Sequence, residues 1–152
     1  MLKRMGIRVV LLLTALVLYA CAATGPIFET VRDSLPPLGE NNGRLFFYRE
    51  YAVFGSAMIP EIIISGKKVG ESIPGGVFYV DLLAGEYDII IPTIFYPGQN
   101  NLRVNLGPRE VQYIRTWIGA SGWGGRAYIE LVPKTTAINA MTELGVTNAR
   151  TD

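Results

Sequence analysis

Short runs of alternating polar and apolar residues dominate the chain after residue 43. The alternation is clearest in 101–106 and 110–118, as expected for strands with one buried face and one face in water. Five other runs are rich in the β-branched and aromatic residues that favour strands. They are 44–49, 61–65, 77–82, 86–91 and 127–132. Glycine and proline separate the runs, and residues 66–70 predict a turn.

No helical period lies between these runs. The sequence therefore predicts an all-β domain over 43–133, an antiparallel β-sandwich of about seven strands with a prealbumin-like or immunoglobulin-like architecture. Thr135 or Thr136 can cap a short C-terminal helix within 134–147. Four apolar residues fall on one face of this helix and are expected to pack on the sandwich: Ala137, Ile138, Met141 and Leu144. A frayed tail, 148–152, is expected to follow.

The first 21 residues combine a basic start, a short apolar run and a cysteine after small residues. The apolar run, 9–20, is shorter than the roughly 20 residues that span a bilayer, so 1–20 predicts a secretion signal peptide. The segment Leu18-Tyr19-Ala20-Cys21 resembles the lipobox of bacterial lipoproteins. The resemblance implies that Cys21 receives a diacylglyceryl group and becomes the first residue of the mature protein. The alternatives are an uncleaved anchor or an ordinary signal peptide in which Cys21 is incidental.

Residues 21–42 contain several prolines and glycines and no regular period. They predict a flexible tether between the lipidated cysteine and the domain, with at most a brief helical turn at 28–35. Ala22 follows the cysteine. In a Gram-negative host the resemblance to lipoproteins then implies an outer-membrane anchor facing the periplasm.

Histidine is absent, and Cys21 is the only cysteine. These absences exclude a Ser-His-Asp triad, a Cys-His pair, the usual zinc sites and haem ligation by histidine. Carboxylate chemistry, a Ser-Lys arrangement or a calcium site remains open, but the sequence contains no motif for any of them. We therefore predict no catalytic residue, no metal and no cofactor, and a protein that is not an enzyme.

The charge of the chain changes when the signal peptide is removed. Cleavage takes away three of the 14 Lys and Arg residues and leaves a net charge of about −2, which argues against nucleic-acid binding. Six arginines lie in the predicted domain, and they either bind an anionic ligand or are solvated and paired with acids such as Glu50, Glu86 and Glu130. They are Arg44, Arg49, Arg103, Arg109, Arg115 and Arg126.

Several turn and strand-end motifs carry a family resemblance. In order they are Gly43-Arg44, Tyr48-Arg49, Ser65-Gly66-Lys67 with Val69-Gly70, and Leu83-Ala84-Gly85-Glu86-Tyr87. This order resembles a bacterial lipoprotein family of unknown function. Its turns also resemble those of PEGA surface modules and other prealbumin-like sandwiches. The resemblance implies a surface or periplasmic accessory module with no assigned reaction.

Three connections carry candidate binding residues. The glycine-rich segment 121–126 presents Trp123 and Arg126, and an exposed tryptophan there can stack on a sugar or anchor a partner. Alternatively, Trp123 closes one end of the sandwich. The connections 51–60 and 91–98 are apolar and contain Phe54, Phe95 and Tyr96. They either form an exposed patch for a partner or are covered by each other or by the C-terminal helix.

These observations lead to two hypotheses. The first is a lipid-anchored, non-enzymatic module that binds or scaffolds another envelope protein or polymer through its loops. The alternative is a glycan-binding protein or a carboxylate-dependent hydrolase, with a site built from Asp81, Glu86 or Asp88 near Trp117 or Trp123. A hydrolase requires two carboxylates within about 5–10 Å of each other in a cleft.

Overall fold

A computed structural model describes residues 23–92, 99–122 and 124–148. The predicted signal peptide and four of the candidate residues, Cys21, Phe95, Tyr96 and Trp123, lie outside the described residues.

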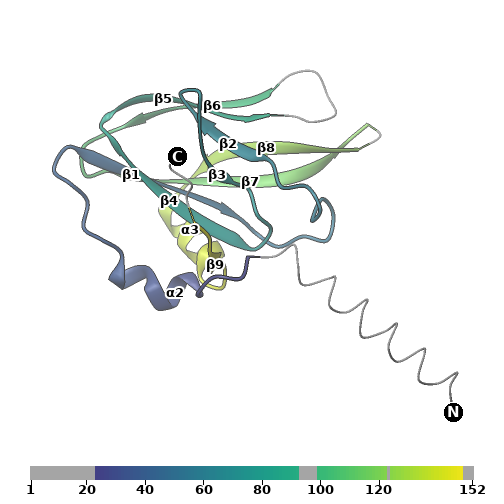
Figure 1. The fold of residues 1–152 in the computed structure, drawn as a ribbon, viewed down its shortest axis with the longest axis horizontal. Coiled ribbons are helices and arrows are strands. Elements are labelled where there is room, and N and C mark those ends of the chain that lie inside the picture. The colour runs from purple at the N-terminus through teal and green to yellow at the C-terminus, as the bar shows by residue number, and fades with distance from the viewer. Residues whose placement is uncertain (1–22, 93–98, 123, 149–152) are drawn as a thin grey trace, which may run out of the picture.

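The domain is a sandwich of two β-sheets (Figure 1). The first sheet has the order β8-β7-β1-β4-β9, and the second has the order β3-β2-β5-β6. The strands of the first sheet are β1 (Asn42–Arg49), β4 (Gly76–Leu83), β7 (Val111–Ser121), β8 (Gly124–Val132) and β9 (Gly145–Val146). Those of the second are β2 (Glu61–Ile64), β3 (Lys67–Glu71), β5 (Gly85–Pro92) and β6 (Gln99–Leu106). The predicted all-β sandwich class is confirmed.

The pairing differs from a wholly antiparallel sandwich at two places. Strands β1 and β7 pair in parallel, and so do β4 and β9. Between β1 and β7 the chain crosses to the second sheet and back. Strand β7 then runs in the same direction as β1. The described chain therefore contains the seven predicted strands and two more, β3 and β9.

Strand β3 was predicted as a turn because its sequence, Lys-Lys-Val-Gly-Glu, looks polar. In the structure the turn is limited to Ser65 and Gly66, whose φ angles are 48° and 83°. Lys68 then forms ion pairs with Glu61 at 2.8 Å and Glu71 at 2.7 Å, which support the β2–β3 hairpin on its polar face.

Apolar side chains fill the space between the two sheets. Leu45 and Phe47 of β1 point into this core, and Phe47 stacks on Phe78 of β4 at 5.1 Å. On the opposite face of the first sheet, Phe46 and Tyr48 belong to a second apolar cluster. Strand β1 is therefore buried on both faces, which explains why its sequence does not alternate.

A short N-terminal segment covers part of that second face. It consists of helix α2 (Phe28–Val31) and a 3₁₀ turn η1 (Arg32–Ser34). The Phe28 side chain is 2% exposed and meets the Phe46 ring edge to face at 5.6 Å. The Phe28 N–H also donates to the Leu144 carbonyl at 2.8 Å. The structure thus differs from the expected flexible tether, because burial of Phe28 and pairing of the backbone hold this segment on the domain.

The C-terminal helix α3 (Lys134–Met141) covers another part of this face. It is shorter than the predicted 134–147, since the chain leaves the helix and adds β9 beside β4. Ala137 and Met141 are buried as expected, but the residue before the helix is Pro133 and no side chain caps it.

Candidate functional site

Several loops gather at one end of the sandwich, on the right in Figure 1. There β1 ends beside the start of β4, β5 ends beside the start of β6, and β7 turns into β8. We call the described connections at this end, 50–60 and 72–75, the loop end. The opposite end holds residues 39–42, 84 and 107–110.

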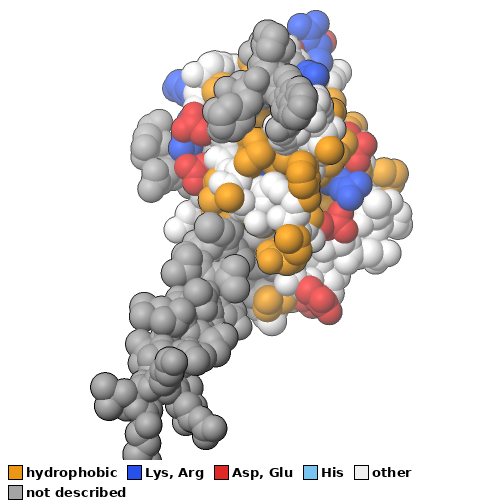
Figure 2. Space-filling model, turned by 90° about the vertical axis from the view of Figure 1, so that its right-hand side faces the viewer, with side chains coloured by type: hydrophobic (Ala, Val, Ile, Leu, Met, Phe, Trp, Pro, Cys, Tyr) orange, Lys and Arg blue, Asp and Glu red, His pale blue; other side chains and the backbone are white. Residues whose placement is uncertain are grey.

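The loop end exposes a group of apolar side chains. Tyr51 is 64% exposed, Val53 is 81% exposed and Phe54, one of the predicted binding residues, is 53% exposed. Ile59 is 37% exposed. Figure 2 looks onto this end and shows hydrophobic side chains gathered on it, with charged side chains mainly toward the edges of the view. Of the two possibilities left open for connection 51–60, the structure thus favours an exposed patch.

The loop that carries this patch is fixed by a buried arginine. The Arg49 guanidinium, on a residue only 2% exposed, donates to the carbonyls of Met58 at 2.7 Å, Ser72 at 3.0 Å and Gly55 at 2.8 Å. Burial lowers the pKa of Arg49 from its ordinary value. The expectation that the arginines are solvated or paired with acids is wrong for Arg49, because its partners are carbonyls of the loop end.

Gly55 brings the same loop close to the core. Its φ is +75°, and a Cβ atom there would lie 2.5 Å from Cβ of Ile118. The Met58 side chain packs partly buried against the core between the sheets. The base of the loop is therefore anchored while Val53 and Phe54 stay outside.

Arg126 lies on the outer face of the first sheet and belongs to a row of aromatic and basic side chains. Its guanidinium lies 5.8 Å from the Tyr128 ring and donates to Oδ1 of Asn100 at 3.2 Å. Tyr128 stacks on Trp117 with centroids 5.2 Å apart, and Arg115 lies 5.6 Å from the Trp117 ring. This row is a partly exposed surface on which the two aromatic rings face each other and an arginine lies over each ring.

The three carboxylates of the hydrolase hypothesis are divided between the two sheets. Asp81 is on β4 of the first sheet, where it receives two hydrogen bonds from Arg44 at 2.6 and 2.7 Å. The bond to Asp81 raises the pKa of Arg44. Asp88 is on β5 of the second sheet with Glu86, and its hydrogen bond from Arg103 at 2.8 Å lowers the pKa of Asp88. Asp81 therefore lies on a different sheet from Glu86 and Asp88, which are both exposed on one face of β5, and both Asp81 and Asp88 are paired with arginine.

Another acidic group lies near Arg115 and was not predicted as a site. Arg115 binds Glu50 at 2.8 Å and Glu130 at 3.5 Å, at a cleft of about 490 Å³ that Tyr48 also lines. The buried Tyr48 hydroxyl has no hydrogen-bond partner among the described residues, and burial raises its pKa. Arg115 of β7 and Glu130 of β8 lie directly opposite each other, so the register of the two strands accounts for their ion pair. The cleft, in contrast, depends on where helix α3 lies on the sheet.

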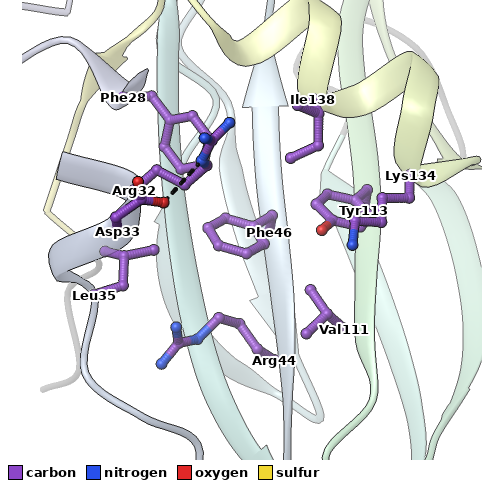
Figure 3. A pocket seen from close by; sticks show the side chains of 10 residues that line it. All are labelled: Phe28, Arg32, Asp33, Leu35, Arg44, Phe46, Val111, Tyr113, Lys134 and Ile138. Atoms are coloured by element: carbon purple, nitrogen blue, oxygen red, sulfur yellow. Dashed lines mark hydrogen bonds and ion pairs between the residues drawn. The ribbon is translucent and has the colours of Figure 1, made fainter. Parts of the chain in front are cut away.

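A second cleft, of about 460 Å³, lies between the N-terminal segment and α3 (Figure 3). Phe28, Phe46 and Tyr113 form its apolar wall. Arg32 and Arg44 reach its rim, but Arg32 is bound to Glu29 at 3.1 Å and Arg44 is bound to Asp81. The cleft can hold a small apolar group, and its two arginines are already paired with carboxylates.

No cluster of acidic side chains within 23–92, 99–122 and 124–148 is suited to hold a metal ion. In the same ranges, no helix has the length and apolar character needed to cross a membrane.

Comparison with known proteins finds a statistically significant sequence similarity to one relative. An uncharacterized protein of Haemophilus influenzae is 28% identical over 148 residues, which cover 95% of this chain and 86% of that protein. No family model matches this chain, and no solved structure matches it significantly. The similarity therefore extends over nearly the whole chain but assigns no activity.

Proposed function

We propose that this chain is a lipoprotein of the cell envelope, anchored through Cys21, and that its sandwich is a non-enzymatic binding or scaffolding module that acts through its loop end. The signal-like pattern of residues 1–20 and the lipobox-like Leu18–Cys21 support the anchor. In a Gram-negative host the anchor lies in the outer membrane and the domain faces the periplasm.

The observation that carries the binding function is the exposed apolar group at the loop end. Tyr51, Val53 and Phe54 are each more than half exposed, although Arg49 fixes the loop that bears them. A fixed loop with exposed aromatic residues is typical of a contact surface. The exposed position of Glu86 and Asp88 on β5, with Asp81 on the other sheet, favours binding over carboxylate hydrolysis.

Glycan binding is the second candidate, and a specific observation favours it. The stacked pair Trp117 and Tyr128 lies on the outer face of the first sheet, flanked by Arg115 and Arg126. Arg126 can pair with an acidic group on a glycan, whereas Arg115 is already bound to Glu50 and Glu130.

The anchor is tested by replacing its cysteine. Cys21→Ser removes the thiol that would receive the diacylglyceryl group, so we expect no incorporation of labelled palmitate and, because cleavage of a lipoprotein precursor follows lipidation, no cleavage before residue 21. The measurement combines fatty-acid labelling with the mass of the N-terminal peptide. Ala22→Ser, which keeps the thiol, is the matched control and is expected to behave like the parent. Absence of label from the parent, or equal labelling of the Cys21→Ser protein, would contradict the anchor.

Crosslinking addresses the partner. A pulldown from gently crosslinked host cells is expected to enrich one envelope component with the native protein and not with Cys21→Ser. Enrichment with both forms would show that binding does not need the tether, and the absence of a protein partner in both samples would favour a glycan ligand.

A further inference from the structure

We propose that the loop end docks on the lipid bilayer that holds the anchor, with Tyr51, Val53 and Phe54 inserted into its interfacial region. The inference rests on the proposed lipidation of Cys21, and it names the bilayer as the partner of the apolar loop. It also gives the domain a fixed orientation, with the opposite end directed away from the membrane.

The first argument is the short distance between the anchor and the domain. The Ala23 N–H donates to the Pro74 carbonyl at 3.2 Å, so the chain is already fixed to the loop end two residues after Cys21. Two extended residues span about 7 Å. The backbone of Cys21 therefore lies within about 10 Å of the Pro74 carbonyl, and the domain stays close to the bilayer while this contact holds.

The second argument is that the apolar loop lies beside this attachment point. A Cβ atom on Gly75 would lie 3.9 Å from Cβ of Tyr51, so the turn that binds Ala23 also touches the apolar loop. An acyl chain that enters the membrane next to Ala23 brings Tyr51 and its neighbours to the membrane surface.

The third argument is the chemistry of the loop. Residues 51–59 contain no charged side chain, and the tyrosine and phenylalanine among them are the kind of aromatic residues that settle at membrane interfaces. The acids that flank the loop are held in ion pairs at its base, Glu50 with Arg115 at 2.8 Å and Glu61 with Lys68 at 2.8 Å, although each cation is shared with a second acid. The apolar loop itself therefore carries no charge that would repel the headgroups of anionic lipids.

The fourth argument is that the loop is held ready for contact. The hydrogen bonds from Arg49 to Gly55 and Met58 fix its base, so the loop does not fold back to cover Val53, which is 81% exposed. A fixed loop loses little conformational freedom on docking. A membrane already linked to the chain is a partner at high effective concentration, so a small apolar patch is sufficient.

The experiment places a fluorescent probe on the loop of the lipidated full chain. Because lipidation consumes the thiol of Cys21, a cysteine introduced by Val53→Cys is the only free thiol. The labelled protein is reconstituted into vesicles of phosphatidylethanolamine and phosphatidylglycerol that contain a nitroxide-labelled lipid. We expect the probe at position 53 to be quenched at least twofold more than the matched probe introduced by Ala84→Cys at the opposite end.

The outcomes separate the two proposals. The mass of the N-terminal peptide shows whether Cys21 carries a lipid. If it does, but the probe at position 53 is quenched no more than the probe at position 84, or both are quenched only weakly, the docking inference fails and the anchor stands. If the mass shows no lipid on Cys21, the anchor fails and the inference fails with it. If the probe at position 53 becomes shielded from solvent only after envelope proteins are added to the vesicles, the inference is also overturned, in favour of a protein partner.

Discussion

Arg49→Met is expected to lower the free energy of unfolding by about 3 kcal/mol. The substitution keeps most of the apolar stem but removes the donors to the carbonyls of Gly55, Met58 and Ser72. A hydrogen bond to a charged group contributes roughly 1.5–3 kcal/mol, and relief of the cost of burying the guanidinium offsets part of the loss. Urea unfolding followed by circular dichroism measures the change.

Arg103→Met is the matched control for this prediction. Arg103 also lies in the β-sandwich, but its side chain is 74% exposed and pairs with Asp88 at the surface, so its loss is expected to change stability little. Equal effects of the two substitutions would contradict the role assigned to Arg49 at the loop end.

Phe28→Ala is expected to cost about 3 kcal/mol and to release the N-terminal segment from the domain. The side chain is 2% exposed and packs on Phe46, so its removal leaves a cavity at the centre of the second apolar cluster. Thermal unfolding measures the loss of stability. Limited trypsin digestion measures the release, because cleavage after Arg32 should become faster.

Ile27→Ala provides the comparison, since Ile27 is 44% exposed and precedes the same helix. It is expected to have a much smaller effect on both measurements. If Phe28→Ala left stability and cleavage unchanged, residues 23–35 would be the flexible tether that their sequence predicts, and the short link between anchor and domain would be lost.

The sequence predicts the strands best where one face of a strand is buried. Residues 101–106 alternate because Val104 and Leu106 point into the core while Arg103 faces water, and the strand lies where the pattern places it. Strand β3 was missed because its polar residues pair with side chains from β2, a contact that no local pattern reveals.

The sequence predicts less about segments that depend on distant partners. Prolines at 26, 36 and 37 made the N-terminal segment look like a spacer, yet Phe28 is buried against side chains of α3 and bonded to Leu144, which lie more than 100 residues later in the chain. The parallel pairing of β1 with β7 is likewise set by the path of the chain.

The candidate site was predicted in part. Composition alone identified 51–60 as an apolar connection, and the structure shows Phe54 exposed there. The role of Arg49 was not predicted. Its side chain is buried and binds only backbone carbonyls, and the local sequence of such an arginine does not differ from that of a solvated arginine on a strand.

Hydrogen–deuterium exchange on the unsubstituted lipidated protein tests the central claim most directly. The lipidated protein bound to vesicles is compared, peptide by peptide, with the unlipidated Cys21→Ser form kept without vesicles. The account predicts slower exchange on the membrane in peptides from 50–60 and 72–75, and unchanged exchange in 39–42 and 107–110. Unchanged exchange at the loop end, or slower exchange at the opposite end, would contradict a domain that docks on the bilayer through Tyr51, Val53 and Phe54.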